Sequence, residues 1–409
     1  MSRHALVPRI PVARALLRGA LLASLLPLAG CAQLQAVNEG FNSLTEYITG
    51  KDNAAPPTPL QEIKEEVAVE VVWKDTVGEG YDGHSLNLIP ALDGDRLYVA
   101  SHDGHVEARD KNTGQVLWAV DTGYPFSGGI GVGPGHLLIG TDNADMVALS
   151  ATDGALQWQA TVSSEVLSIP KEDKGFVVIR CTDGRLYGLD AATGGRRWYF
   201  ERPVPALSLR IMGGPAVAGG LVVDGYAGGK LVALKLEDGQ VQWETMVAHP
   251  RGRSEIERLV DLGGEPAVQS DMLYLAGFNG GLAAVSMAGG EVQWRIETVS
   301  GDTGPVVSGR SLYLTDDDSD VWRFETNIGG DMWRQGDLHQ RRLTVPAVFQ
   351  NLVVVGDFEG YVHFLSQEDG HIMGRIQVGK EPFAPKLVAD DAHVYAYSKD
   401  GTLAALRVH

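Results

Sequence analysis

The segment that decides the fold spans residues 97–118 and reads LYVASHDGHVEARDKNTGQVLW. Two β-rich runs are joined by Asp103-Gly104, and a third run follows Thr113-Gly114 and ends at Trp118. Pairs that end in glycine supply the positive φ that tight hairpin turns require. Within the runs apolar and polar residues alternate, as in half-buried strands. The segment therefore predicts consecutive antiparallel strands.

The same pattern recurs along the rest of the chain. Its turn pairs are Asp153-Gly154, Thr193-Gly194, Asp238-Gly239, Gly289-Gly290, Gly329-Gly330 and Asp369-Gly370. The closing tryptophan recurs as Trp158, Trp198, Trp243, Trp294 and Trp333, and Gly374 takes its place in the seventh copy. Successive tryptophans are 40, 40, 45, 51 and 39 residues apart. A period near forty with about four strands per copy is typical of β-propellers, and a tryptophan in nearly every copy indicates packing between blades.

The two ends of the pattern complement each other. The last copy has strands around Asp400-Gly401 and then stops without a closing strand or tryptophan. Residues 67–73 form such a strand, with Trp73 in the missing place. We therefore expect an all-β fold over 67–409, an eight-bladed propeller of four-stranded antiparallel blades. The N-terminal strand would close the ring, which removes an exposed sheet edge.

Residues 1–30 are typical of a secretory signal peptide, with four arginines ahead of a short apolar run at 20–29. The run ends in Leu28-Ala29-Gly30-Cys31, which resembles the bacterial lipobox. Cys31 would then carry lipid, and Ala32 favours the outer membrane. The alternative is an ordinary signal peptide followed by a chance cysteine. Residues 31–66 are polar and irregular, and we expect a lipidated N-terminus and a flexible tether.

Composition limits the remaining functions. The formal net charge of −18 repels phosphates and argues against nucleic-acid binding. With Cys31 acylated, Cys181 has no cysteine with which to form a disulfide, and we interpret it as a buried thiol. The sequence contains no zinc-protease, nucleophile-elbow or P-loop motif.

The long tryptophan spacings place insertions after Trp198 and after Trp243. Both fall on links from an outer strand to the next inner strand, in consecutive blades, so they should lie side by side on one rim. The first contains Leu207, Leu209 and Arg210, which suit a protein-docking patch. Alternatively, the leucines begin the core of the next blade. The second, residues 251–262, concentrates charge of both signs, and its alternative is a solvated loop.

Several features together resemble the BamB family, lipoproteins of the outer-membrane β-barrel assembly machinery. These are the lipobox, the pyrroloquinoline-quinone-type repeats, Leu-Ser-Leu-Arg at 207–210 and Glu-Ile-Glu-Arg-Leu at 255–259. The resemblance implies a lipid-anchored, non-catalytic scaffold at the periplasmic face of the outer membrane, without a cofactor. It would assist folding and insertion of outer-membrane proteins and also contact them while unfolded.

By the same resemblance, Leu207, Leu209, Arg210 and Asp261 would contact the periplasmic domains of the barrel subunit, BamA. Asp261 would act as an exposed charge. The family pattern has a second acidic residue two positions later, where this chain has Gly263. The acidic half of the site is therefore expected to be weaker here.

Two other functions are compatible with such repeats. One is a quinone-dependent dehydrogenase, but this chain lacks the adjacent cysteines common in those enzymes. Its acidic run at 316–320, aligned as a calcium loop, has Val321 at position six and Asn327 at position twelve, where glycine and glutamate are required. The other is a generic propeller lipoprotein that binds sugars or peptides, against which only the loop segments argue.

The lipobox generates a direct test. Cys31→Ser should abolish lipidation and leave the protein uncleaved or mislocalised, because the thiol is the acceptor of the diacylglycerol. Mass spectrometry of the mature N-terminus measures this. An unmodified chain beginning at Ala32 in the parent protein would contradict the prediction.

Overall fold

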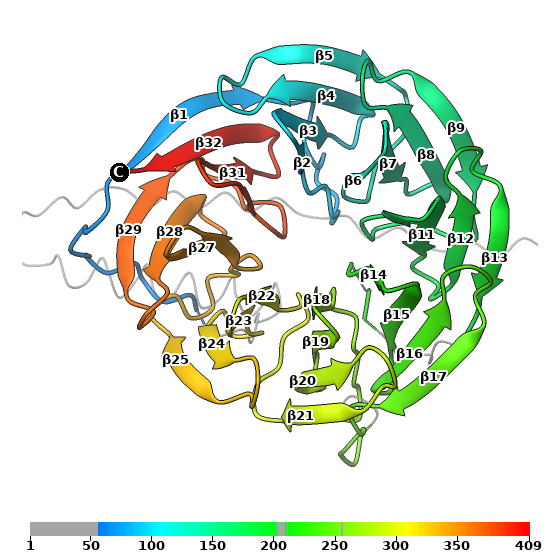
Figure 1. Cartoon of the computed structure of the whole chain (residues 1–409). Coiled ribbons are helices and arrows are strands. Elements are labelled where there is room, and N and C mark those ends of the chain that lie inside the picture. The colour runs from blue at the N-terminus through cyan, green and yellow to red at the C-terminus, as the bar shows by residue number, and fades with distance from the viewer. Residues whose placement is uncertain (1–55, 203–208, 211, 255–256) are drawn as a thin grey trace, which may run out of the picture. The chain divides into compact units, whose positions relative to one another are not determined.

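The computed structural model describes residues 56–202, 209–210, 212–254 and 257–409. In this part of the chain, thirty-two strands form eight four-stranded antiparallel sheets arranged as the blades of a ring (Figure 1). The expected eight-bladed propeller is confirmed. A search of the described residues for a helix long and apolar enough to cross a membrane finds none.

Blades 1 to 4 follow one another along the chain, and each runs from an inner strand to an outer strand. Blade 1 is β2 (Ala91–Asp93), β3 (Arg96–Ala100), β4 (His105–Asp110) and β5 (Val116–Asp121); blade 2 is β6 (Gly131–Gly133), β7 (His136–Gly140), β8 (Asp145–Ser150) and β9 (Leu156–Thr161). Blade 3 is β10 (Lys171–Asp173), β11 (Phe176–Arg180), β12 (Leu186–Asp190) and β13 (Arg196–Phe200); blade 4 is β14 (Ala216–Ala218), β15 (Leu221–Tyr226), β16 (Lys230–Lys235) and β17 (Val241–Met246).

Blades 5 to 7 repeat this order, and blade 8 combines the two ends of the chain. Blade 5 is β18 (Ala267–Gln269), β19 (Met272–Gly277), β20 (Gly281–Ser286) and β21 (Val292–Ile296); blade 6 is β22 (Val306–Ser308), β23 (Ser311–Thr315), β24 (Val321–Glu325) and β25 (Asp331–Gln335). Blade 7 is β26 (Ala347–Phe349), β27 (Leu352–Gly356), β28 (Tyr361–Ser366) and β29 (Ile372–Gln377); blade 8 is β30 (Val388–Ala389), β31 (Val394–Tyr397), β32 (Thr402–Val408) and β1 (Val69–Thr76).

Burial differs between the strands of a blade. In blade 2, every residue of β7 is buried, whereas β9 is mostly exposed and buries Trp158. The middle strands lie between two neighbouring blades, so both of their faces are covered. This burial on both faces explains why their sequences are apolar runs rather than strict alternations.

The tryptophans of the outer strands join each blade to the next. The indole N–H of Trp73 and of the six repeat tryptophans donates to a backbone carbonyl of the following blade, at 2.7–3.2 Å. The acceptors are the carbonyls of Lys111, Ala151, Ala191, Leu236, Met287, Thr326 and Gln367. The predicted packing role is thus observed, and the indole N–H group is satisfied as well.

Each of these rings also lies over a glycine in a turn of the next blade. Gly154, at φ +74°, illustrates the reason, because a Cβ on it would lie 2.8 Å from the ring of Trp118. The turn requires glycine for two reasons: the φ of this residue is positive, and the indole occupies the space that a side chain would take. The repeated glycines and tryptophans are therefore one structural device.

Blade 8 closes the ring as predicted. Strand β1 pairs with β32 from Val69 opposite Val408 to Thr76 opposite Thr402. These two strands come from opposite ends of the chain, so blade 8 has no turn between them on which a tryptophan of blade 7 could lie. Gly374 stands there instead, and a Cβ on it would lie 2.8 Å from Cγ2 of Val67.

The segment before β1 is less free than the expected tether. The Thr58 amide donates to the His339 carbonyl, and Arg341 donates to the Thr58 carbonyl. Arg375, on the outer strand of blade 7, donates to the Gln61 carbonyl. An outer strand exposes unpaired backbone groups and polar side chains, and an extended segment can form hydrogen bonds with them. The tether expected over 31–66 is therefore corrected from Thr58 onward, while Cys31 lies outside the described residues.

Ring closure can be tested by deletion. Removing residues 67–73 should lower the unfolding midpoint of the whole propeller by about 5 °C or more, because it removes ladder hydrogen bonds and the Trp73 packing. Thermal unfolding followed by circular dichroism measures the midpoint, with Glu62→Ala, at an exposed position of the preceding segment, as control. An unchanged midpoint in the deletion variant would count against closure by β1.

Candidate functional site

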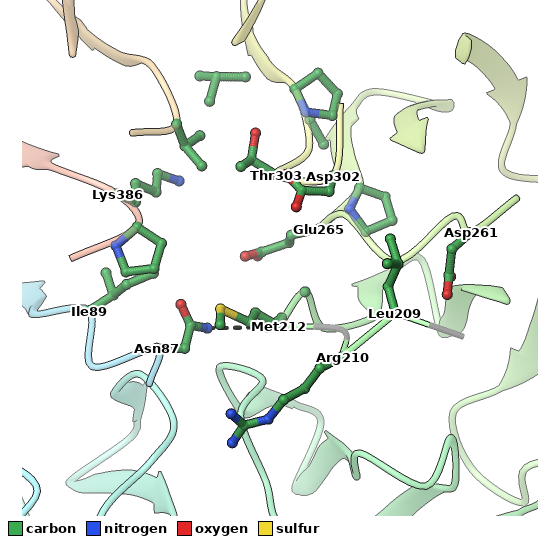
Figure 2. A pocket seen from close by; sticks show the side chains of 18 of the residues that line it. Asn87, Ile89, Leu209, Arg210, Met212, Asp261, Glu265, Asp302, Thr303 and Lys386 are labelled. Carbon is green, nitrogen blue, oxygen red and sulfur yellow. Dashed lines mark hydrogen bonds between the residues drawn. The ribbon is translucent and has the colours of Figure 1, made fainter. Parts of the chain in front are cut away.

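The links between blades gather at one end of the ring, which we call the connector face. There they surround a cavity of about 340 Å³, the connector cavity. The two insertions, links 201–215 and 247–266, contribute adjacent parts of its wall, and Figure 2 shows Leu209, Arg210, Met212 and Asp261 together. The described residues of the two insertions that line the cavity therefore lie side by side, as the sequence predicts.

The two inserted links are packed backbone to backbone. A Cβ on Gly213 would lie 2.3 Å from the carbonyl oxygen of Gly263, so a side chain at Gly213 would push the links apart. Gly263 itself lines the connector cavity. The position that departs from the expected acidic pattern is thus part of the cavity wall.

The rest of the wall is mainly apolar, with a few polar groups. Asn87 donates through its side-chain amide to the carbonyls of Leu167 and Met212, at 2.9 and 3.2 Å, and so ties three links together. Glu265 forms an ion pair with Lys171 at 2.6 Å. An apolar wall with a few placed polar groups is typical of a binding site.

Arg210 is held across the connector face. Its guanidinium makes two bonds to the Glu165 carboxylate, at 2.6 and 2.8 Å, and one to the Ser85 carbonyl at 3.1 Å. The Arg210 side chain is 47% exposed, so it remains accessible while its direction is fixed. Sequence reasoning found Arg210 but missed Glu165, because Glu165 lies in a link of ordinary length.

Leu209 lines the connector cavity and is half-buried. It is therefore neither a buried core residue of blade 4 nor fully exposed. Leu207 lies outside the described residues.

Asp261 corrects one expectation. The residue is 1% exposed, and its backbone forms bridges to Ala227 and to Phe278 of the neighbouring blades. Neither carboxylate oxygen accepts a hydrogen bond of full geometry from the described residues. Asp261 was expected as an exposed charge, but the link carries it inward between blades 4 and 5, into the cavity wall.

Burial raises the pKa of Asp261 to about 6, and the neighbouring Asp224 carboxylate acts in the same direction. Arg180 opposes the shift, as does the backbone amide of Leu209, which lies near the carboxylate without completing a hydrogen bond. Asp261 therefore remains mostly ionised at neutral pH in an environment that disfavours the charge.

Beneath Asp261 lies a buried ion pair that sequence reasoning missed. Arg180 of β11 donates to Asp224 of β15 and to the Gly225 carbonyl, both at 2.9 Å, and its guanidinium lies 5.3 Å from the centre of the Tyr226 ring. Desolvation raises the pKa of Asp224 even so. Charged residues inside two otherwise apolar strands were the available signal.

Fold and site together define a class: an eight-bladed propeller of quinone-type repeats whose inter-blade links surround a cavity at the connector face. A family profile described as "Outer membrane protein assembly factor BamB" matches residues 102–335 and 318–409. A protein of that name from Bordetella pertussis is 33% identical over 396 residues, covering 96% of this chain and 97% of its own. The chain belongs to the BamB family.

Solved structures agree with this assignment. The crystal structure of BamB from Moraxella catarrhalis matches with a TM-score of 0.75 and 27% identity, over 83% of this chain and 100% of that chain. A quinohemoprotein alcohol dehydrogenase from Comamonas testosteroni matches with a TM-score of 0.65 at 12% identity, over 83% of this chain and 76% of that chain. The likeness to the dehydrogenase shows the fold alone.

The two arginines of the site should differ in their effect on stability. Arg180→Met should lower the free energy of unfolding by about 3 kcal/mol, because it leaves two buried carboxylates without a counter-charge. Arg210→Met, which breaks an exposed pair, should cost about 1 kcal/mol or less. Urea unfolding at pH 7.5 measures both variants. Equal losses would mean that the Arg180 cluster is not a buried charge site.

Proposed function

We propose that this chain is a non-catalytic scaffold lipoprotein of the outer-membrane β-barrel assembly complex. It binds the periplasmic domains of BamA and assists the folding and insertion of outer-membrane proteins. The observation that carries the proposal is the meeting of Leu209 and Arg210 with the cavity wall at Asp261, on links from adjacent blades. Family membership supports the same function.

The surface suits protein docking because it is organised before the partner arrives. Arg210 is fixed by Glu165 and Ser85, so little side-chain entropy is lost when a partner contacts it. Leu209 offers an apolar contact beside a cavity, next to Arg210, and a few central contacts carry most of the binding energy of an interface. Leu207, two residues away in the same link, belongs to the proposed surface by its sequence.

Membrane attachment through acylated Cys31 at the periplasmic face of the outer membrane completes the proposal. The described chain joins the propeller at Thr58, which contacts the link of residues 336–346 on the connector face. A lipid anchor at Cys31 would hold the propeller at the membrane in which a β-barrel partner is embedded.

A non-catalytic role is preferred to quinone chemistry. The relatives that match this chain along nearly its whole length are named as assembly factors. The dehydrogenase likeness rests on blade geometry at low identity. We therefore propose no cofactor and no reaction.

The docking surface can be tested by substitution. Leu209→Ala and Arg210→Ala should each weaken binding of the purified BamA periplasmic domains by roughly thirtyfold, about 2 kcal/mol, as expected for a contact at the centre of an interface. Leu156→Ala is the matched control, since Leu156 is a 54% exposed leucine on the outer strand of another blade.

Biolayer interferometry with the lipid-free propeller measures these affinities, and circular dichroism confirms that each variant is folded. The control should bind like the parent. If the Leu209 and Arg210 variants also bind like the parent, this surface is not the docking site.

A further inference from the structure

The chain that precedes β1 is bound to blade 7, although β1 itself belongs to blade 8. We call residues 58–66 the N-terminal strap. At its first residue, the Thr58 amide donates to the His339 carbonyl at 3.0 Å, and Arg341 donates to the Thr58 carbonyl at 3.1 Å. Both partners lie in the link that leads into blade 7. Arg341 is 2% exposed and also pairs with Asp357 at 2.7 Å, so the strap begins on a side chain that is itself held in place.

Further contacts follow along the N-terminal strap. The Leu60 side chain packs against the hydrophobic core at the junction of blades 6 and 7. Arg375 of β29 donates to the Gln61 carbonyl at 2.8 Å, and the Glu66 amide donates to the Met373 carbonyl at 2.7 Å. The strap therefore runs along blade 7, from the connector face to the beginning of β29, before the chain enters β1 (Figure 1).

The strand that follows the strap closes the ring by hydrogen bonds and packing alone. β1 and β32 come from the two ends of the chain, and their ladder begins with Val69 opposite Val408. A pull on the chain just ahead of Val69 would load this end pair first and then each next pair in turn. Hydrogen bonds that carry the load one at a time break at a lower force than the same bonds loaded together. Loss of β1 would open the ring and expose a sheet edge.

We propose that the N-terminal strap is a mechanical clamp, which transfers a pull on the N-terminal tether to blade 7 before it reaches β1. The inference rests on the proposed function, because acylated Cys31 and a docked partner would be the two attachments between which the propeller is pulled. Blade 7 suits this role, since its four strands follow one another in the chain. Gly374 of β29 leaves space for the end of the clamp, because a Cβ there would lie 2.8 Å from Cγ2 of Val67.

The clamp needs only modest binding to protect the ring. β1 can peel only while the strap is undocked, so a strap that docks again quickly multiplies the lifetime of the closed ring. The factor is the ratio of docked to undocked strap. A tenfold ratio corresponds to about 1.4 kcal/mol, which one or two hydrogen bonds from arginine side chains, such as those of Arg341 and Arg375, can supply.

The test applies the same pull at two points of the chain. In the mature lipid-free chain, residues 32–409, one handle is attached through Pro56→Cys, ahead of the strap, or through Ala68→Cys, just after it. The second handle is attached through Glu237→Cys, in a turn of blade 4, and all three positions are exposed. Cys181 is buried and its pKa is raised to about 11 by desolvation, so the coupling reagent reacts with the introduced thiols.

Optical tweezers at constant low force measure the time before the ring opens. The ring should last about tenfold longer when pulled at residue 56 than at residue 68, because at residue 68 the pull does not pass through the strap. Circular dichroism checks that each chain is folded before it is pulled.

Variants of the strap contacts separate a clamp from a general stabiliser. Leu60→Ala combined with Arg375→Met weakens the strap and leaves the buried pairs of Arg341 intact. This double variant should lose the tenfold advantage at residue 56 and match the parent at residue 68. Lys64→Ala is the matched control, since the Lys64 side chain is 88% exposed and pairs with Glu66 of the same strap. It should behave like the parent at both points.

Two outcomes overturn the inference. Equal parent lifetimes at the two attachment points would mean that the strap carries no load. A double variant that shortens the lifetime equally at both points would mean that the strap only stabilises blade 7. A mature protein without lipid at Cys31 would instead refute the proposed membrane attachment, and with it the source of the pull, while the measured lifetimes would stay the same.

Discussion

The contact on which the whole molecule depends is the tryptophan of one blade lying on the glycine turn of the next. Its ring fills the space that a side chain would take, and its N–H group satisfies a carbonyl of the same turn. A single four-stranded sheet cannot bury both faces, so a blade is stable only between neighbours. Each copy of the repeat therefore supplies both the strands of a blade and its contact with the next blade. The ring must close because otherwise the first and last blades would each lack one neighbour.

Closure also explains why the docking surface is where it is. A closed ring fixes the angle between successive blades, so links from adjacent blades have little freedom in their relative position. Leu209 and Asp261 are more than fifty residues apart in sequence, yet they line one cavity because their links leave neighbouring outer strands at the same end. The backbone contact between Gly213 and Gly263 tightens that arrangement further. The precision of the site thus comes from the scaffold and not from the loops themselves.

The sequence was enough to predict the fold, because the tryptophan and glycine positions encode local turns and a period. It was also enough to place Leu209 and Arg210 on one face, because counting residues locates insertions. It could not reveal that Asp261 is buried or that Arg210 pairs with Glu165, since both depend on which residues of neighbouring blades and links come into contact. The Arg180–Asp224 pair was hidden for the same reason: its members are 44 residues apart and belong to different blades. The docking of residues 58–66 on blade 7 depends likewise on contacts between segments about 300 residues apart.

The connector face keeps polar groups that a fold selected for stability alone would lose. Apolar residues of similar size at Asp224 and Asp261 would avoid the desolvation of two carboxylates that share one arginine. The ring can tolerate this local cost because its stability comes from eight similar blades and the junctions between them. Violations of local rules that an otherwise consistent structure retains are expected at functional sites. The excess of buried carboxylates near Leu209 and Arg210 is such a violation. Its position next to the proposed docking surface is what a functional site would explain.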